Sequence, residues 1–281
     1  MRRRLKNLLF SLPFPVSKFL RYDALKLFDF LYDTRSKDLP PMSLVRYGGY
    51  GTDIKVARLF VSMLAEHCGL HEGDAFLDLG CGVGLISLPV MSVIGSTGRL
   101  CGLDIIPESV AWCNRSIRTR WPNSEFTHAD VFNASYNPMG KIRASDYRLP
   151  YENAEFDVAL LKSVFTHMRS AEVHNYLAEI ARVLKPGGRA LITFFVLNPE
   201  TRRLIAEARS QFDFSHEFEG GMVVNPDIPE DAIAFEYSVI SDWFRQCGFV
   251  VKEILWGSWR GGALDVGQTA TSQDVITLVK G

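Results

Sequence analysis

The sequence lacks the features that mark several large classes of protein. Its five cysteines among 281 residues are scattered and form no C-x-x-C pair and no Cys/His cluster with zinc spacing. We therefore expect reduced thiols in a cytoplasmic protein, without structural disulfides or a zinc site. A formal net charge of -1 gives no basic field that would attract nucleic acid. No apolar run reaches the roughly 18 residues that a membrane-spanning helix needs.

The composition predicts one large α/β domain preceded by a separate arm. Hydrophobic residues make up 47% of the chain and charged residues 22%, which is typical of a globular protein. In residues 1–38, a basic cluster at 2–6 precedes an amphipathic helical pattern at 18–32. Prolines at 13 and 15 interrupt the apolar segment, so we expect no signal peptide. The arm either lies on a membrane face or packs on the main domain, 39–281, or on a second subunit as in a homodimer, and we favour packing.

The stretch from Ala75 to Leu85, A-F-L-D-L-G-C-G-V-G-L, organises the main domain. A short apolar strand is followed by three glycines at alternate positions and then by a helical pattern. Such glycines allow positive φ angles and let a ligand approach the backbone closely. A strand, a glycine turn and a helix start form the nucleotide-binding corner of a doubly wound sheet. The G-x-G-x-G spacing differs from the G-x-G-x-x-G of dinucleotide enzymes, which disfavours a dehydrogenase.

A second strand-like run, 98–104, ends in Asp104, which lies 20 residues beyond Gly84. A carboxylate at the end of the second strand accepts hydrogen bonds from both ribose hydroxyls in nucleotide-binding sheets. Alone, Asp104 also fits a cap for the helix expected from Pro107. Its distance from the glycine turn favours the ribose ligand.

The glycine stretch resembles the first motif of class I S-adenosylmethionine-dependent methyltransferases, and L-K-P-G-G-R at 184–189 is similar to a second motif of that class. The chain looks like the bacterial type 11/12 small-molecule methyltransferases, most specifically over 74–131 and 155–196. This resemblance implies a doubly wound, seven-stranded, Rossmann-like α/β sheet, mostly parallel with an antiparallel last strand. The segments 132–150 and 197–235 are then insertions that form substrate-side elements.

The resemblance also implies how the cofactor, S-adenosylmethionine, is bound. The segment before the first strand closes over it, which makes Tyr47 and Arg46 candidates for contacts to its methionine end. The end of the third strand holds the adenine, with Asp130 on its amino group and Val131 against its ring. Asp146 competes for the adenine role, but Asp130 directly follows a strand. The predicted cofactor residues are Tyr47, Asp78, Gly80, Cys81, Gly82, Gly84, Asp104, Ile105, Asp130, Val131 and Lys162.

His167 is the predicted general base. It follows the fourth strand, whose carboxyl end faces the site in a parallel sheet. An imidazole with an ordinary pKa of about 6.5 suits proton transfer at neutral pH. The alternative is a structural histidine that opens the next helix. Weaker candidates, for substrate binding, are Tyr50, His216 and Trp259.

Motifs of other methyltransferases are missing from the sequence. No Asn- or Asp-Pro-Pro-Tyr follows the fourth strand, and no Pro-Cys is present to attack a pyrimidine carbon. Lys162 and Ser163 stand where metal-dependent catechol-type enzymes place metal-binding Asp and Asn, so we expect no metal. In-line displacement from the sulfonium onto an oxygen, or less often onto a nitrogen or an activated carbon, remains, and it depends mainly on alignment and exclusion of water.

Three hypotheses for function follow. The first is a cytoplasmic methyltransferase that acts on a hydroxyl of a small molecule, such as a sugar or a lipid-linked glycan. The second is a quinone or lipid methyltransferase, peripheral at the inner membrane face through the arm at 1–38. The third is a non-catalytic S-adenosylmethionine-binding subunit.

Overall fold

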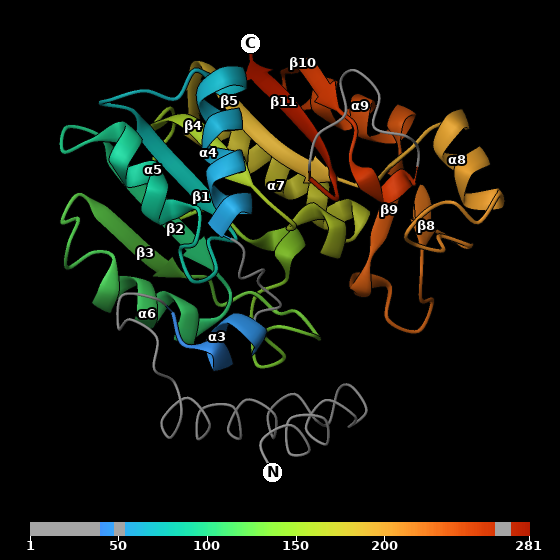
Figure 1. Ribbon diagram of the computed structural model, residues 1–281, viewed down its shortest axis with the longest axis horizontal. Helices are drawn as coiled ribbons and strands as arrows, with labels where there is room; N and C mark the ends of the chain where they lie inside the picture. Colours follow the sequence, from blue (N-terminus) through green and yellow to red (C-terminus); the bar gives the residue numbers. More distant parts are fainter. Residues whose placement is uncertain (1–39, 48–53, 262–270) are drawn as a thin grey trace.

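The computed structural model describes residues 40–47, 54–261 and 271–281. Seven strands form its main sheet (Figure 1). They are β1 (Ala75–Leu79), β2 (Arg99–Asp104), β3 (Ser124–His128), β4 (Phe156–Leu161), β5 (Leu184–Phe194), β10 (Phe249–Leu255) and β11 (Asp274–Lys280). The arm at 1–38 lies outside the described residues, so its packing, its membrane contact and a homodimer stay predictions.

The strand order of the main sheet is β10-β11-β5-β4-β1-β2-β3. β1 pairs in parallel with β2 and β4, and β3 and β5 continue the sheet in parallel on either side. β11 is antiparallel to both of its neighbours, β5 and β10. The predicted doubly wound sheet with an antiparallel last strand is confirmed. The chain order reverses between β1 and β4, and sheets of this kind bind ligands at such a reversal.

Helices cover both faces of this sheet (Figure 1). They are α3 (Met42–Tyr47), α4 (Ile54–Cys68), α5 (Ser87–Ile94), α6 (Pro107–Ser116), α7 (Ser170–Val183), α8 (Pro199–Ala206) and α9 (Tyr237–Gln246). α4, α5 and α6 pack on one face with Phe76 and Leu100, whereas α7 and α9 pack on the other with Leu77 and Cys101. Neighbouring residues of a strand thus enter opposite cores. Of the helices in the described ranges, none is long and apolar enough to cross a membrane.

Two local boundaries differ from the sequence prediction. The L-K-P-G-G-R segment, predicted as a turn before a strand, belongs to β5, whose pairing with β4 shifts between Leu184 and Arg189. Gly187, at φ 73°, lies in the bulge that this shift creates. The helix expected directly after the glycine turn begins at Ser87, because the turn continues for two more residues. Pro89 therefore lies in the first helical turn, where its missing N–H breaks no helical hydrogen bond.

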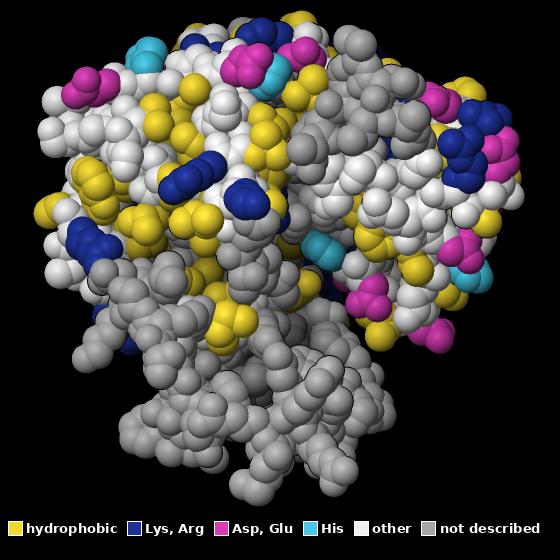
Figure 2. Space-filling view, viewed as in Figure 1, with side chains coloured by type: hydrophobic (Ala, Val, Ile, Leu, Met, Phe, Trp, Pro, Cys, Tyr) yellow, Lys and Arg dark blue, Asp and Glu magenta, His cyan; other side chains and the backbone are white. Residues whose placement is uncertain are grey.

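The segment predicted as an insertion at 197–235 contributes to a second, smaller sheet with the order β6-β9-β8-β7. Its strands are β6 (Val196–Leu197), β7 (His216–Phe218), β8 (Gly221–Val223) and β9 (Ile233–Glu236). β7 and β8 form a hairpin within a stretch that its Phe, Gly and Pro content had suggested to be irregular. α8 carries charged side chains, which gather at that side of the molecule in Figure 2.

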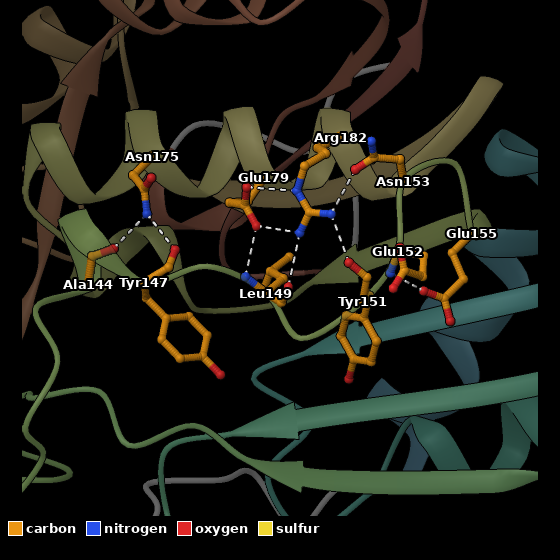
Figure 3. Close-up of polar contacts among 10 residues, drawn as sticks. All are labelled: Ala144, Tyr147, Leu149, Tyr151, Glu152, Asn153, Glu155, Asn175, Glu179 and Arg182. Carbon is orange, nitrogen blue, oxygen red and sulfur yellow. Dashed lines mark hydrogen bonds and ion pairs between the residues drawn. The ribbon is translucent and has the colours of Figure 1, made fainter.

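Side chains of α7 hold the chain segment that leads into β4 (Figure 3). The guanidinium of Arg182 donates to two backbone carbonyls of this segment and pairs with Glu179, with Nη2 2.6 Å from Oε2. The side-chain amide of Asn175 donates to two further carbonyls. The four carbonyls belong to Ala144, Tyr147, Leu149 and Tyr151. The end of the 132–150 insertion is thereby fixed to α7.

The carboxylate of Asp274, at the start of β11, joins three segments. Its Oδ2 accepts the backbone N–H of Val196 and the indole N–H of Trp259, both at 2.8 Å, and Oδ1 accepts the N–H of Gly257 at 2.7 Å. The side chain is fully buried, and burial raises the pKa of Asp274 to about 7. Three donors therefore depend on one buried acceptor, and its loss leaves all three unpaired.

We expect Asp274→Ala to lower the free energy of unfolding by about 3 kcal/mol, because buried donors lose their acceptor. Urea unfolding followed by circular dichroism measures this loss. Asp242→Ala is the matched control, since Asp242 pairs with Arg245 at the surface, and it should cost less than about 0.5 kcal/mol. Equal losses in the two variants would contradict the joining role of Asp274.

Candidate functional site

A cavity of about 560 Å³ opens at the carboxyl ends of β1, β2 and β4. Asp78 near the end of β1, Asp104 at the end of β2 and Lys162 after β4 all line it. Polar side chains collect here because the strand interiors are buried on both faces. The volume falls in the range of small-molecule sites.

Asp104 ties the glycine turn after β1 to the end of β2. Its Oδ2 accepts the backbone N–H of Gly82 at 2.7 Å, and Oδ1 accepts that of Ile106 at 2.8 Å. A carboxylate only accepts hydrogen bonds and has about four lone-pair positions. Gly80 has a φ of 76°, and a Cβ there would lie 2.5 Å from Cγ2 of Val164, so the turn requires glycine at this position.

Asp78 and Lys162 place opposite charges in one part of the cavity. Asp78 is 3% exposed and accepts the hydroxyl of Ser87 at 2.5 Å. Burial raises the pKa of Asp78 to about 7, although Ser87 and the charge of Lys162 act in the opposite direction. Burial also lowers the pKa of Lys162, against the attraction of Asp78. A carboxylate and an ammonium in one sheltered pocket suit a ligand group that itself carries both charges.

A polar network surrounds Ser163, the residue after Lys162. Ser163 is held at a φ of 56°, a conformation that few residues other than glycine adopt. Its N–H donates to Oγ1 of Thr193 at 2.8 Å, and its hydroxyl donates to Oε1 of Gln273 at 2.9 Å. The hydroxyl of Thr193 donates to the same Oε1 at 2.7 Å. These bonds explain how the strained turn after β4 is maintained beside the cavity.

His167 lines the cavity and is partly buried. Its Nδ1 lies 2.9 Å from the backbone carbonyl oxygen of Glu230. Because a carbonyl only accepts, Nδ1 carries the proton and Nε2 of the neutral ring holds the lone pair. Burial lowers the pKa of His167 below its ordinary 6.5, while the carbonyl of Glu230 and the charge of Asp231 raise it in part.

An aromatic and apolar wall adjoins His167. The ring of Tyr136 meets the imidazole of His167 edge to face, with 5.9 Å between ring centroids. Tyr176 and Met168 also line the cavity, and so does Glu172, whose pKa is raised by burial. Such a wall suits a flat, largely apolar ligand with few polar groups.

Several of these residues were missed by the sequence analysis. Tyr136 lies in an insertion, and Glu172 and Tyr176 lie on a helix, where no motif marks them. Gln273 directly precedes β11, and an antiparallel strand begins at the edge where its parallel neighbours end. Applying the strand-end rule to the start of the antiparallel strand would therefore have found Gln273.

The structure brings most of the predicted cofactor residues together. The predicted residues on the cavity wall are Asp78, Gly80, Cys81, Asp104, Ile105, Val131, Lys162 and His167. The backbone N–H of Gly82 donates to the carboxylate of Asp104. A Cβ on Gly84 would lie 2.2 Å from Cδ1 of Ile117. Asp130 is not among the lining residues, and its carboxylate lies 4.0 Å from Nζ of Lys141.

Of the predicted substrate residues, the two that the structure describes, Trp259 and His216, do not line the cavity. Trp259 is fully buried in an apolar cluster with Phe195 and Phe214, because its large ring is packed there and its N–H is bound to Asp274. His216 is exposed on β7, in the smaller sheet. Tyr47 belongs to α3, but its side chain, like all of Tyr50, lies outside what the structure describes.

Comparison with known sequences gives the family. Residues 77–192 match the family model of the methyltransferase domain. Over 144 residues the chain is 30% identical to the chloroplastic 2-phytyl-1,4-beta-naphthoquinone methyltransferase of Arabidopsis thaliana, which covers 49% of this chain and 48% of that protein. The chain is also 28% identical over 135 residues to sterol 4-C-methyltransferase strm-1 of Caenorhabditis elegans. That match covers 46% of this chain and 33% of that protein. The chain thus spans about half the length, or less, of these relatives.

Comparison with solved structures gives the fold. The 1,6-didemethyltoxoflavin-N1-methyltransferase of Burkholderia thailandensis, solved with S-adenosylhomocysteine, matches at a TM-score of 0.53 and 18% identity, covering 92% of this chain and 89% of that one. The [4+2]-cyclase SpnF matches at 0.52 and 20% identity over 80% of both chains. A fold shared with a cyclase does not by itself show an activity. The sequence match shows a methyltransferase domain at residues 77–192, and the structural match shows that the chain has the fold of solved S-adenosylmethionine-dependent methyltransferases.

Proposed function

We propose that this chain transfers a methyl group from S-adenosylmethionine to a hydroxyl group of a small molecule. The observation that carries the proposal is His167, which lines the cavity with Nδ1 bonded to a carbonyl and the lone pair on Nε2. A non-catalytic binding subunit would have no need of a base in this state. The match to relatives over about half their length supports the same reaction class.

The donor set on the β1 and β2 side of the cavity fits the cofactor. Asp104 suits the ribose hydroxyls, because a carboxylate is an acceptor only, and apolar Ile105 and Val131 suit the adenine. Asp78 is suited to the ammonium of the methionine end and Lys162 to its carboxylate. When bound, S-adenosylmethionine supplies a methyl group on a positively charged sulfur that leaves readily.

His167 is suited to take the proton of the acceptor hydroxyl on Nε2. Its lowered pKa keeps the ring neutral at pH 7, so the lone pair is available. The other proton stays on Nδ1 during this transfer, hydrogen-bonded to the carbonyl oxygen of Glu230. The aromatic wall excludes water from the reacting oxygen and orients the acceptor.

The residues beside His167 favour a planar, largely apolar ring as the acceptor. Tyr136, Met168 and Tyr176 offer aromatic and thioether surface to such a ring. The relatives whose names refer to naphthoquinone support this choice. A sugar hydroxyl is the second candidate, because the polar groups of Ser163 and Gln273 also line the cavity.

We expect cofactor affinity to rise as the pH increases from 5.5 to 7.5. The carboxyl of Asp78 has a pKa of about 7 in the ligand-free protein, and only its ionised form attracts the ammonium of the cofactor. Calorimetric titration with S-adenosylmethionine across this range measures the effect. Asp78→Asn should flatten the profile, and a flat profile for the unaltered protein would contradict the role of Asp78.

We expect Asp104→Ala to weaken S-adenosylmethionine binding by roughly tenfold to a hundredfold, since two charge-assisted hydrogen bonds are lost. Asp130→Ala is the matched control, because Asp130 does not line the cavity, and it should change affinity less than about threefold. Isothermal titration calorimetry on folded variants gives both values. A larger loss of affinity in Asp130→Ala than in Asp104→Ala would contradict the role of Asp104 in cofactor binding.

We expect His167→Gln to reduce kcat by about 10²-fold at neutral pH while leaving cofactor affinity nearly unchanged. In the unaltered enzyme, kcat should fall as the pH drops through the pKa of His167, which lies below 6.5. The fall occurs on the acid side because protonation removes the lone pair. Rate measurements with a hydroxylated aromatic acceptor test this. A variant that keeps both the rate and the pH profile would show that His167 is only structural.

A further inference from the structure

The ring of His167 is oriented by a segment far away in the sequence. The carbonyl that accepts from Nδ1 belongs to Glu230, 63 residues later. Glu230 lies in a short 3-10 helix, Pro229–Asp231, within the connection between β8 and β9. A free histidine in water favours the opposite tautomer, with the proton on Nε2. The position of this one carbonyl therefore decides which ring nitrogen has the lone pair.

The side chain of the same Glu230 is held by the chain just after His167. Nε of Arg169 donates to Oε1 of Glu230 at 2.7 Å, and the carboxylate is only 18% exposed. The guanidinium of Arg169 also lies 5.3 Å from the ring centroid of Phe218, and its Nη1 is 3.6 Å from Oε1 of Glu219. Arg169 is thus fixed on several sides and gives Glu230 a defined anchor.

These contacts close a small ring of interactions. Glu230 is attached to the segment 167–169 at two points, by its backbone carbonyl at one end and by its carboxylate at the other. With two attachment points, rotation of the 3-10 helix about either one is restricted. With the ion pair removed, the carbonyl loses one of the two contacts that hold it against the segment 167–169.

We propose that the Arg169–Glu230 ion pair is a positioning device that keeps the carbonyl of Glu230 on Nδ1 of His167, and so keeps the lone pair on Nε2. Neither Arg169 nor Glu230 lines the cavity, so the pair acts only through His167. Its value for catalysis rests on the proposed role of His167 as the base. The tautomer itself is a property of the folded chain without any ligand.

The test uses nitrogen-15 NMR of the full chain labelled at its six histidines, with the His167 signals assigned from the His167→Gln variant. At a pH above the titration of the ring, the unaltered protein should show a protonated-type Nδ1 and an unprotonated-type Nε2 for His167. Arg169→Ala and Glu230→Ala should each shift the tautomer ratio toward the Nε2-protonated form by about two- to fivefold, the range of a partly exposed ion pair. The double variant should shift it no further, because either change breaks the same pair.

Arg203→Ala and Glu207→Ala are the matched controls. Their ion pair has the same 2.7 Å separation but lies on the surface of α8, and neither change should alter the His167 signals. Glu230→Gln, which keeps the shape of the side chain, serves where Glu230→Ala is poorly folded. Unchanged His167 signals in the folded Arg169 and Glu230 variants, or additive shifts in the double variant, would overturn the inference.

Kinetics separate this inference from the proposed function. If His167 is the base, kcat in the Arg169 and Glu230 variants should fall in proportion to the fraction of His167 that keeps the proton on Nδ1, as measured by NMR, with S-adenosylmethionine affinity unchanged. A shift in the tautomer without any change in kcat supports the positioning device and removes His167 as the base.

Discussion

Burial of the central strands on both faces is the constraint on which the rest of the structure depends. Neighbours on β1, Phe76 and Leu77, enter opposite cores, and so do Val158 and Ala159 on β4. Polar side chains in the middle of such strands would lose their hydration without finding partners, so they are confined to the strand ends. Because the parallel strands end at one edge, the charged groups meet there and line a single cavity.

Burial of the ionised Asp78 carboxylate at this edge costs free energy, and a nearby positive charge lowers that cost. The pKa of Asp78 is raised by burial to about 7, from 3.8 when exposed. The folded protein therefore binds more protons than the unfolded chain between these values, and the ligand-free protein loses stability as the pH rises from about 4 to 7. A bound cation near Asp78 removes this penalty. The burial that disfavours the ionised carboxylate thus also strengthens its attraction for a positive charge.

The two insertions supply what the sheet does not. The sheet provides acids and a lysine at its edge, whereas Tyr136 comes from the insertion at 132–150 and the carbonyl of Glu230 comes from the one at 197–235. The segment 132–150 is fixed to α7 by hydrogen bonds from α7 side chains to its backbone carbonyls (Figure 3). The segment 197–235 is fixed to the start of α7 by an ion pair.

Local periodicity and the rule that ligands bind at strand ends predicted the strands that carry Asp78 and Asp104. The resemblance to methyltransferases predicted the seven-stranded sheet and its antiparallel last strand. Residue pattern alone assigned Trp259 to the site, since a tryptophan in a glycine-rich loop carries no local sign of whether it is buried. It also could not reveal the partner of His167, which lies 63 residues away. Only the tertiary structure decided these points. Burial of a large side chain and contacts between distant loops depend on how the insertions fold back on the sheet, and local sequence does not encode that path.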